Sequence, residues 1–259
     1  MSSKFQKLLG KHVLIIGGTS GIGYGVAEAC LASGAQVTIS SSSLTRVTDK
    51  VKQLQESYPS STVSGYACDL SKPTLEADLT QLFEQVVSSR GNKLDHIVFT
   101  ACDQLELIPW RDISLDFFRS AGQMRLFAQF FVGKIGSRYL NPGPESSIVL
   151  TTGTSSEKPI PGWAMVASYA AGLKGLTRNL ALDLRPIRVN IVSPGFVETE
   201  LWQNMEAEKR EPLFDWVRNT MPTAKVGTPE EVAEAYLWLM KDTNVTGSVA
   251  CTNAGMKLV

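Results

Sequence analysis

The sequence predicts a doubly wound α/β fold, in which helices cover both faces of one parallel sheet. Continuous apolar runs recur along the chain, and helical patterns separate most of them: HVLIIG, QVTIS, TVSGYA, HIVFTA, SSIVLTT, IRVNIVS and GSVACT. Such runs are typical of strands that are buried on both faces. No linker rich in Pro, Gly or Ser divides the chain, so we expect the 259 residues to form a single domain.

Composition excludes several classes of partner. Lys+Arg and Asp+Glu both number 25, so no basic surface is indicated for nucleic acid or acidic lipid. The two histidines, His12 and His96, each begin an apolar run, and the four cysteines are widely spaced, so we expect no metal site. We find neither a signal-type segment nor a membrane span, and we expect a cytoplasmic protein with reduced thiols.

A glycine turn follows the first predicted strand. The segment HVLIIGGTSGIGYGVAEAC places Gly17, Gly21 and Gly23 between this strand and the first helix. Glycine lets backbone N–H groups and the helix N-terminus approach a pyrophosphate, because it has no Cβ to block the ligand. The alternative is a tight turn without a ligand. The position after the first strand favours a Rossmann-like dinucleotide site.

The end of the second predicted strand favours NADP(H) over NAD(H). An NAD-binding protein usually carries an acidic residue here for the ribose hydroxyls. This chain instead has serines at 40–43, followed by Arg46, which suit a 2′-phosphate. Serines are also common in turns for local reasons.

By these motifs the chain resembles the short-chain dehydrogenase/reductase family from about residue 11 to about residue 256. The resemblance rests also on CDL at Asp69, on RVNIVSPGFVET with Pro194, Gly195 and Thr199, and on the closing TGSVACTNAG. It implies that Asp69 contacts the adenine and that the other three hold the nicotinamide. We divide the domain, 1–259, into a cofactor half at about 11–100, substrate-lining elements at about 101–175 and a lid at 197–221, for which a static helical insertion is the alternative.

The family's catalytic residues are missing. Aligning PGWAMVASYAAGLKGLTR on the family's helix puts Val166 at the catalytic tyrosine and Ala170 at the lysine, while Gly153 takes the serine position and Gln123 the asparagine position. Tyr169 points about 60° or more away from the required direction, so we interpret it as a packing residue or a subunit contact.

A site without an acid suits reactions that need no proton. A positioned acid accelerates carbonyl reduction by about 10²- to 10⁴-fold, whereas hydride delivery to an iminium ion gives a neutral amine directly. An intramolecular cycloaddition needs only a shape that holds two reacting arms together.

Asp103, Arg125 and Trp163 are the candidate catalytic residues. Their structural alternatives are a cap, an ion-pair partner and a core side chain. These positions, with the P-x-P-G-W motif, resemble a divergent branch of the family, the fungal NADPH-dependent reductase/Diels–Alderases of malbrancheamide and paraherquamide biosynthesis. That branch has aspartate where this chain has Ile160, so either Asp103 supports a cationic substrate or reduction is weakened while cycloaddition persists.

The resemblance implies an NADP(H)-binding enzyme that guides a [4+2] cycloaddition of a prenylated indole alkaloid precursor to a bicyclo[2.2.2]diazaoctane, with or without reduction of an iminium-type precursor. A divergent carbonyl reductase and an inert NADP(H)-responsive binding protein are the alternatives. Family members usually pair through the helices predicted at 112–139 and 163–184, so we expect a dimer or tetramer. The expected cofactor-binding residues are Gly17, Thr19, Ser20, Gly21, Ile22, Ser41, Ser42, Ser43, Arg46, Asp69, Leu70, Ala101, Pro194, Gly195, Val197 and Thr199.

Overall fold

One parallel sheet of seven strands forms the centre of the molecule, in the order β3-β2-β1-β4-β5-β6-β7. The computed structural model describes residues 3–104, 108–203 and 205–259. The strands are β1 (His12–Ile16), β2 (Gln36–Ser41), β3 (Val63–Ala67), β4 (His96–Phe99), β5 (Ser147–Thr151), β6 (Arg188–Pro194) and β7 (Val249–Thr252). The predicted doubly wound α/β class is confirmed.

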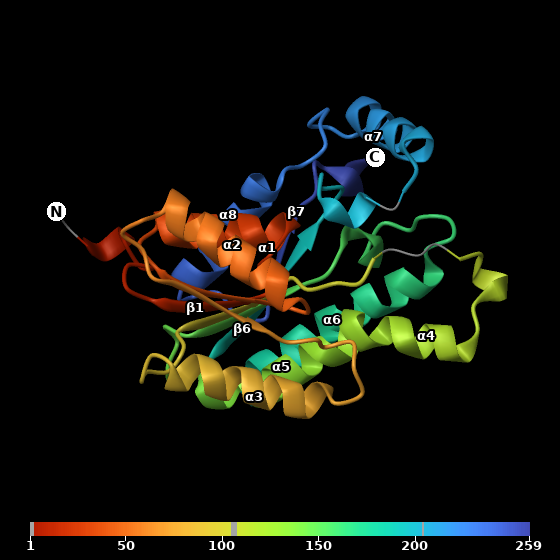
Figure 1. The fold of residues 1–259 in the computed structure, drawn as a ribbon. Helices are drawn as coiled ribbons and strands as arrows, with labels where there is room; N and C mark the ends of the chain where they lie inside the picture. Colours follow the sequence, from red (N-terminus) through yellow and green to blue (C-terminus); the bar gives the residue numbers. More distant parts are fainter. Residues whose placement is uncertain (1–2, 105–107, 204) are drawn as a thin grey trace.

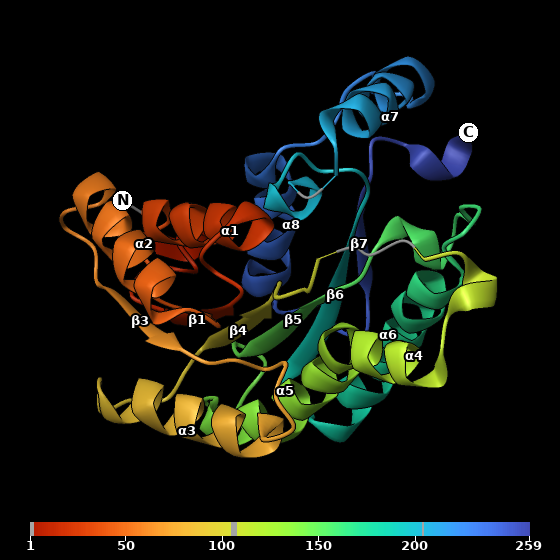
Figure 2. The same ribbon diagram turned by 45° about the vertical axis from the view of Figure 1, so that its right-hand side comes forward.

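Helices cover both faces of this sheet (Figures 1 and 2). One face carries α1 (Gly21–Ala32), α2 (Leu44–Ser57) and α8 (Pro229–Lys241). The other carries α3 (Leu75–Ser88), α4 (Leu115–Gly122), α5 (Ala128–Gly136) and α6 (Ala164–Asp183). The π-helix η3 (Gln123–Phe127) joins α4 to α5, and the 3₁₀ turns are η1 (Ser3–Phe5), η2 (Trp110–Asp112), η4 (Ser137–Tyr139), η5 (Thr154–Ser156), η6 (Glu200–Trp202) and η7 (Met256–Leu258).

Two apolar layers hold these helices to the sheet. Strand β1 is buried along its whole length, and its side chains alternate between the layers: Val13 and Ile15 pack towards α1 and α8, whereas Leu14 and Ile16 pack towards α3 and α5. Both faces therefore need apolar residues, which is why the sequence shows continuous runs.

Helix α8 begins with a capping box. The Thr228 side chain accepts a hydrogen bond from the backbone N–H of Glu231, and the Glu231 carboxylate accepts one from the Thr228 N–H. Pro229 occupies the first turn, where its missing N–H has no partner to lose. This cap fixes the helix that packs against α1, where Pro229 lies against Gly25.

Helix α7 (Ala207–Thr220) stands apart from the two helical layers, beyond the carboxyl-terminal edge of the sheet, and the C-terminus lies beside it in both ribbon views (Figures 1 and 2). Helix α7 therefore lies at the edge where ligands bind in such folds.

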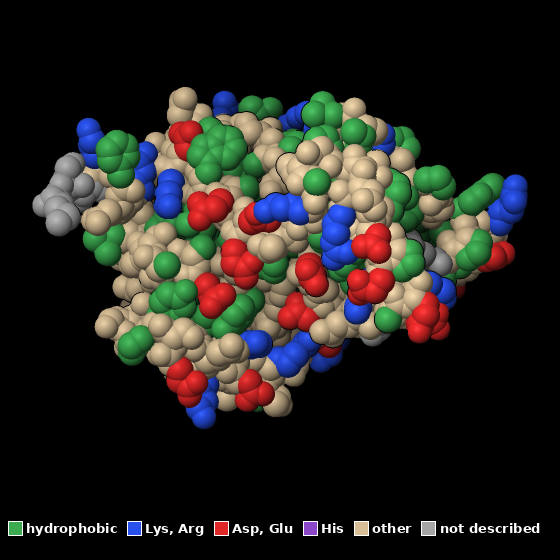
Figure 3. Space-filling view, turned by 90° about the horizontal axis from the view of Figure 1, so that it is seen from above, with side chains coloured by type: hydrophobic (Ala, Val, Ile, Leu, Met, Phe, Trp, Pro, Cys, Tyr) green, Lys and Arg blue, Asp and Glu red, His purple; other side chains and the backbone are tan. Residues whose placement is uncertain are grey.

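The face seen in Figure 3 carries acidic and basic side chains interspersed over its described residues, in keeping with the net charge of zero.

Candidate functional site

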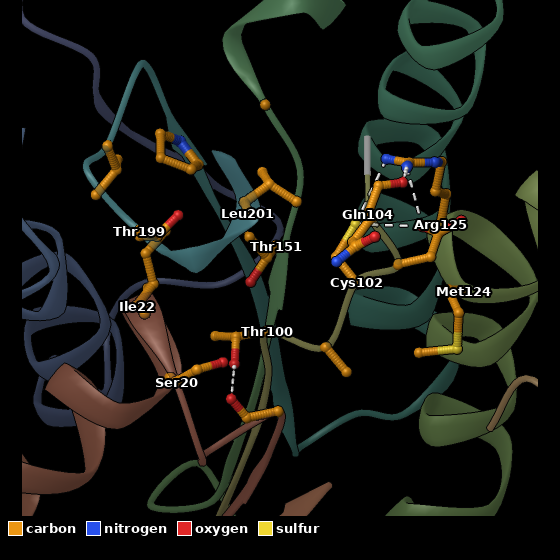
Figure 4. Close-up of a pocket in the computed structure, with 18 of the residues that line it drawn as sticks. Ser20, Ile22, Thr100, Cys102, Gln104, Met124, Arg125, Thr151, Thr199 and Leu201 are labelled. Carbon is orange, nitrogen blue, oxygen red and sulfur yellow. Dashed lines mark hydrogen bonds and ion pairs between the residues drawn. The ribbon is translucent and has the colours of Figure 1, made fainter. Parts of the chain in front are cut away.

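A cavity of about 540 Å³ opens at the carboxyl-terminal edge of the sheet. The ends of β1, β2, β4, β5 and β6 line it, together with η3, the start of α6 and the segment after β6. Figure 4 shows its two sides, with Arg125, Cys102 and Gln104 on one and Thr199 and Leu201 on the other.

The glycine turn forms the floor of the cavity. Gly17 has φ +94°, and a Cβ there would lie 2.4 Å from the Ala101 nitrogen. A Cβ on Gly23 would lie 2.2 Å from the Gly17 oxygen and 2.3 Å from Thr100 Oγ1. The turn can therefore pass this close to β4 only because both residues are glycine.

The N-terminus of α1 faces the cavity. Ser20 is its N-cap but makes no side-chain cap hydrogen bond, and Gly21 and Ile22 line the cavity beside it. The first N–H groups of a helix have no partners within the helix, and they carry partial positive charge. This end is therefore suited to a pyrophosphate.

The serine-rich end of β2 divides into two roles. Ser41, Ser42 and Arg46 line the cavity, and Arg46 Nη2 donates to Ser42 Oγ at 3.1 Å. The Ser41 hydroxyl is buried and has no partner within the described residues. Ser43 differs from the prediction, because its hydroxyl caps α2 by accepting from the Arg46 N–H at 3.3 Å and it stands outside the cavity lining. Turn chemistry, the alternative for these serines, therefore accounts for Ser43.

The remaining predicted cofactor residues all line the cavity: Thr19, Asp69, Leu70, Ala101, Pro194, Gly195, Val197 and Thr199. Asp69 accepts from the Ser71 hydroxyl at 2.7 Å and from its N–H at 3.2 Å, and these bonds hold the pKa of Asp69 below its usual value. The glycine cradle, the open helix end and the buried Ser41 hydroxyl together fit a dinucleotide with a 2′-phosphate.

At the end of the cavity away from the phosphate cradle, Val166 and Ala170 line the wall. These are the positions that the family alignment gives to the catalytic tyrosine and lysine. The Thr152 hydroxyl, beside Gly153, donates to the Ala170 carbonyl at 2.7 Å. Its proton is therefore already used in a bond between β5 and α6. Among the described residues that line the cavity there is neither a tyrosine nor a lysine.

Tyr169 is a packing residue in this structure. It is buried, its hydroxyl donates to the Phe118 carbonyl at 2.6 Å, and its ring packs on Gly122. Burial also raises the pKa of Tyr169 above its usual value. The hydroxyl therefore ties α6 to α4 and is not directed into the cavity.

Asp103 and Arg125 form an ion pair on one wall of the cavity, with Nη2 and Oδ1 2.9 Å apart. The Arg125 side chain is 12% exposed, and it also donates to Cys102 Sγ at 3.4 Å and to the Gln104 carbonyl at 3.2 Å (Figure 4). Burial raises the pKa of the Cys102 thiol to about 11, so it stays neutral at pH 7. The sequence placed Asp103 and Arg125 in one site, and the structure adds Cys102.

Arg125 projects from the π-helix η3, which lines the cavity through Met124 and Arg125. A π-turn inserts an extra residue into a helix and changes the direction of its side chains, and such turns are frequent at functional sites. Gln129, in the following α5, also lines the cavity; it donates to the Arg125 and Thr151 carbonyls and accepts from the Thr151 N–H. Sequence reasoning missed Gln129, because its partner is a strand distant in the chain.

Gln123, which the family alignment places at the asparagine position, stands outside the cavity lining. Its side-chain nitrogen donates to the Leu70 carbonyl at 3.2 Å and to the Lys72 carbonyl at 3.1 Å. It therefore anchors the loop after β3.

The apolar wall includes Trp163 and Ile160, which precede α6. Both pack in a cluster with Trp202 and Phe214 from the segment after β6, and with Met256 near the C-terminus. Trp202 Nε1 donates to the Val197 carbonyl at 2.9 Å. The segment predicted as a lid, outside its undescribed residue 204, thus contributes η6 to the cavity wall and packs α7 against the same cluster.

The two histidines are buried in the core. His12 pairs with Thr38 and His96 with Ser147 in the core, and burial lowers the pKa of His12 to about 4 and that of His96 to about 3. All four cysteines are free, and no group of three or more potential ligands is found in the described part of the chain. The helices described include none with the length and hydropathy that a membrane crossing needs.

Comparison with known proteins identifies the family of this chain. The family model of an SDR-like Rossmann domain matches residues 4–259. The chain belongs to the short-chain dehydrogenase/reductase family. The resemblance predicted from its motifs is confirmed, and the described residues that line its cavity include neither a tyrosine nor a lysine.

Within the family, the chain is 40% identical over 255 residues to the short-chain dehydrogenase/reductase malC of Malbranchea aurantiaca, covering 97% of this chain and 96% of that protein. The solved structure of the MalC reductase/Diels-Alderase superimposes with a TM-score of 0.93 at 38% identity, covering 99% of this chain and 100% of that one. The short-chain dehydrogenase/reductase fsr5 of Gibberella fujikuroi is 41% identical, covering 98% of this chain and 97% of fsr5. A small-chain dehydrogenase solved in complex with NADPH matches at 26% identity with a TM-score of 0.77, covering 96% of this chain and 100% of that one.

Proposed function

We propose that this chain is an NADP(H)-binding enzyme of fungal prenylated indole alkaloid biosynthesis that guides an intramolecular [4+2] cycloaddition to a bicyclo[2.2.2]diazaoctane. The observation that carries the proposal is a cavity with a cofactor cradle at one end and, among its described residues, neither tyrosine nor lysine at the other. The relative titled a reductase/Diels-Alderase supports the same reaction class.

The cavity walls suit a reaction controlled by shape. Trp163, Trp202 and Phe196 supply aromatic surface, and Ile160 and Met256 add aliphatic surface. Such walls hold a substrate in a folded conformation, and an intramolecular reaction gains mainly from holding two arms in contact. Arg125 and Asp103 provide a donor and an acceptor that orient a polar edge of the substrate.

NADPH, when bound, supplies a hydride to an electrophilic carbon such as that of an iminium ion. The chain's own residues support a cation poorly, because Ile160 is apolar and the Asp103 carboxylate already pairs with Arg125. We therefore propose cycloaddition as the main activity, with reduction of an iminium-type precursor as a slower one.

The decisive experiment incubates the protein and NADPH with a dienamine-type precursor and follows the enantiomeric excess of the cycloadduct. We expect one enantiomer in excess and a rate above background. Arg125→Met should lower the excess while NADPH affinity changes less than about twofold, because Arg125 lies on the opposite wall from the phosphate cradle. A racemic product at the uncatalysed rate would refute the proposal.

The carbonyl reductase alternative is tested by NADPH oxidation with a panel of ketones and quinones. We expect no turnover, since the nearby Thr152 and Tyr169 hydroxyls are both bonded to backbone carbonyls. Turnover at the rate of an ordinary family member would replace the cycloaddition proposal. An inert binding protein would bind NADPH and show neither activity.

We propose further that the chain forms a dimer or tetramer through α4, α5 and α6. Large apolar side chains are exposed on these helices and on η3: Leu115, Phe118, Phe127, Phe130 and Leu182. Contiguous exposed apolar surface marks interaction sites in folded proteins. Light scattering should give a dimer or tetramer mass, and Phe130→Glu should reduce it; a monomer at all concentrations would contradict this.

We also propose that the enzyme acts in the cytoplasm on a small-molecule precursor. All four cysteines are free, as expected in a reducing compartment. A fluorescent fusion expressed in a fungal host should distribute through the cytosol, and accumulation in an organelle would contradict this.

A further inference from the structure

Glu157 joins three segments of the chain that are distant in sequence. It lies between η5 and α6, in the loop that continues to Ile160 and Trp163. One oxygen of its carboxylate, Oε2, lies 2.8 Å from Lys174 Nζ on α6 and 3.0 Å from Lys257 Nζ on η7. We call Glu157, Lys174 and Lys257 the clasp.

The two lysines differ in their surroundings. The Lys174 side chain is 12% exposed, whereas those of Lys257 and Glu157 are 37% and 36% exposed. A nearly buried ammonium group needs an anionic partner, so Lys174 fixes Glu157 against α6. The two ammonium groups hold the pKa of Glu157 below its usual value, so the carboxylate is ionised at pH 7.

The clasp holds two parts of the apolar wall. Met256 immediately precedes Lys257; it is 3% exposed and lines the cavity. Ile160 and Trp163 follow Glu157 and pack in the same cluster as Met256. A second contact, from Lys158 Nζ to the Val259 oxygen, joins the same loop and tail.

Glu157 itself does not line the cavity, so it can act on a substrate only through the residues it holds. We propose that Glu157 is a positioning residue, which fixes the loop carrying Ile160 and Trp163 to the C-terminal segment and so sets the shape of the substrate wall. The effect on turnover rests on the proposed function, whereas the effect on the wall does not.

The test compares Glu157→Gln with the wild type by hydrogen–deuterium exchange, NADPH binding and product stereochemistry. We expect faster exchange in residues 157–163 and 256–259 and an NADPH dissociation constant within about twofold of the wild type, because the clasp lies outside the cofactor cradle. Turnover and enantiomeric excess should fall, turnover by about 10- to 100-fold, because a small misplacement of a positioning wall has effects of that order.

Glu76→Gln is the matched control. Glu76 also forms an ion pair between two elements, with Lys134 across α3 and α5, and it lies outside the cavity lining. It should change neither the exchange of the loop and tail nor the product. An effect equal to that of Glu157→Gln would refute a specific role for the clasp.

Two further variants guard against misfolding of Glu157→Gln, which leaves Lys174 without its partner. Lys257→Met releases only the tail and should speed exchange mainly in 256–259, with a partial loss of enantiomeric excess. Glu157→Gln/Lys174→Met removes the buried charge as well, and should fold while keeping the faster loop exchange. Unchanged exchange in both would overturn the inference. If the wild type itself gave racemic product, the proposed function would fail, and exchange would still decide the clasp.

Discussion

The two ends of the cavity are built in different ways. The cofactor end is shaped by backbone: glycines at 17 and 23 lie against neighbouring main chain, and the α1 amides are open. The substrate end is shaped by side chains, among them Val166, Ala170 and the Asp103–Arg125 pair. A site made of backbone is hard to change without losing the fold, whereas side chains can be replaced one at a time. The family's chemistry can therefore change while its cofactor cradle is kept.

The strongest challenge to this comparison restores the missing acid. Val166→Tyr/Ala170→Lys places the family's pair on a wall that already lines the cavity. We expect NADPH-dependent reduction of an activated ketone to rise by about 10²- to 10⁴-fold over the parent protein. The rate at which NADPH absorbance falls measures this reduction. Tyr169→Phe, made in the same background, should leave the gain intact, and no gain with normal NADPH binding would show that more than the acid is missing.

The cofactor end should tolerate substitutions far less well than the substrate end. Gly23→Ala forces a Cβ to within 2.2 Å of the Gly17 oxygen, so we expect a loss of about 1–3 kcal/mol in the free energy of unfolding and weaker NADPH binding. Denaturant unfolding and NADPH fluorescence measure the two effects. Gly175→Ala, where nothing lies within 4 Å, should instead stabilise α6 by about 0.5–1 kcal/mol. Equal behaviour of the two variants would refute the steric argument.

Acid should act on the core without acting on the cavity. The pKa of His12 is lowered to about 4 and that of His96 to about 3 by burial, from 6.5. The unfolded chain therefore binds more protons than the folded chain below about pH 6.5. As the pH decreases, the free energy of unfolding falls by about 1.4 kcal/mol per pH unit for each histidine, until the folded pKa of that histidine is reached. Unfolding at about pH 7.5, 6.5 and 5 should show this loss. NADPH affinity should change much less, and a parallel fall would contradict the separation.

The smallest effect concerns the choice of cofactor. Arg46 lines the cavity beside Ser42, so Arg46→Ala should weaken NADPH binding about tenfold and leave NADH binding nearly unchanged. Dissociation constants for both cofactors measure the preference. Ser43→Ala is the contrasting variant, because Ser43 caps α2: it should lower stability by about 1 kcal/mol without changing the preference. An equal loss of NADPH and NADH affinity in Arg46→Ala would contradict the 2′-phosphate assignment.

Sequence patterns predicted the parts of the site that depend on local backbone and helix register. The glycine spacing placed the cradle, and counting along α6 placed Val166 and Ala170 on the cavity wall and Tyr169 away from it. Contacts between distant segments could not be predicted in this way. Glu157 meets Lys257 across most of the C-terminal half of the chain, and no local pattern marks either residue as a partner.

The π-helix η3 has a consequence for how this site can vary. Deleting one residue between 123 and 127 would return the turn to ordinary α-helical winding. Because the π-turn accommodates one extra residue, α4 and α5 would keep nearly their present orientation, while the side chains within the turn would change direction. Arg125 would turn away from Asp103 even though every residue type around the cavity stayed the same. Chain length at this turn therefore encodes part of the recognition, and a related sequence one residue shorter here should be expected to handle a different molecule.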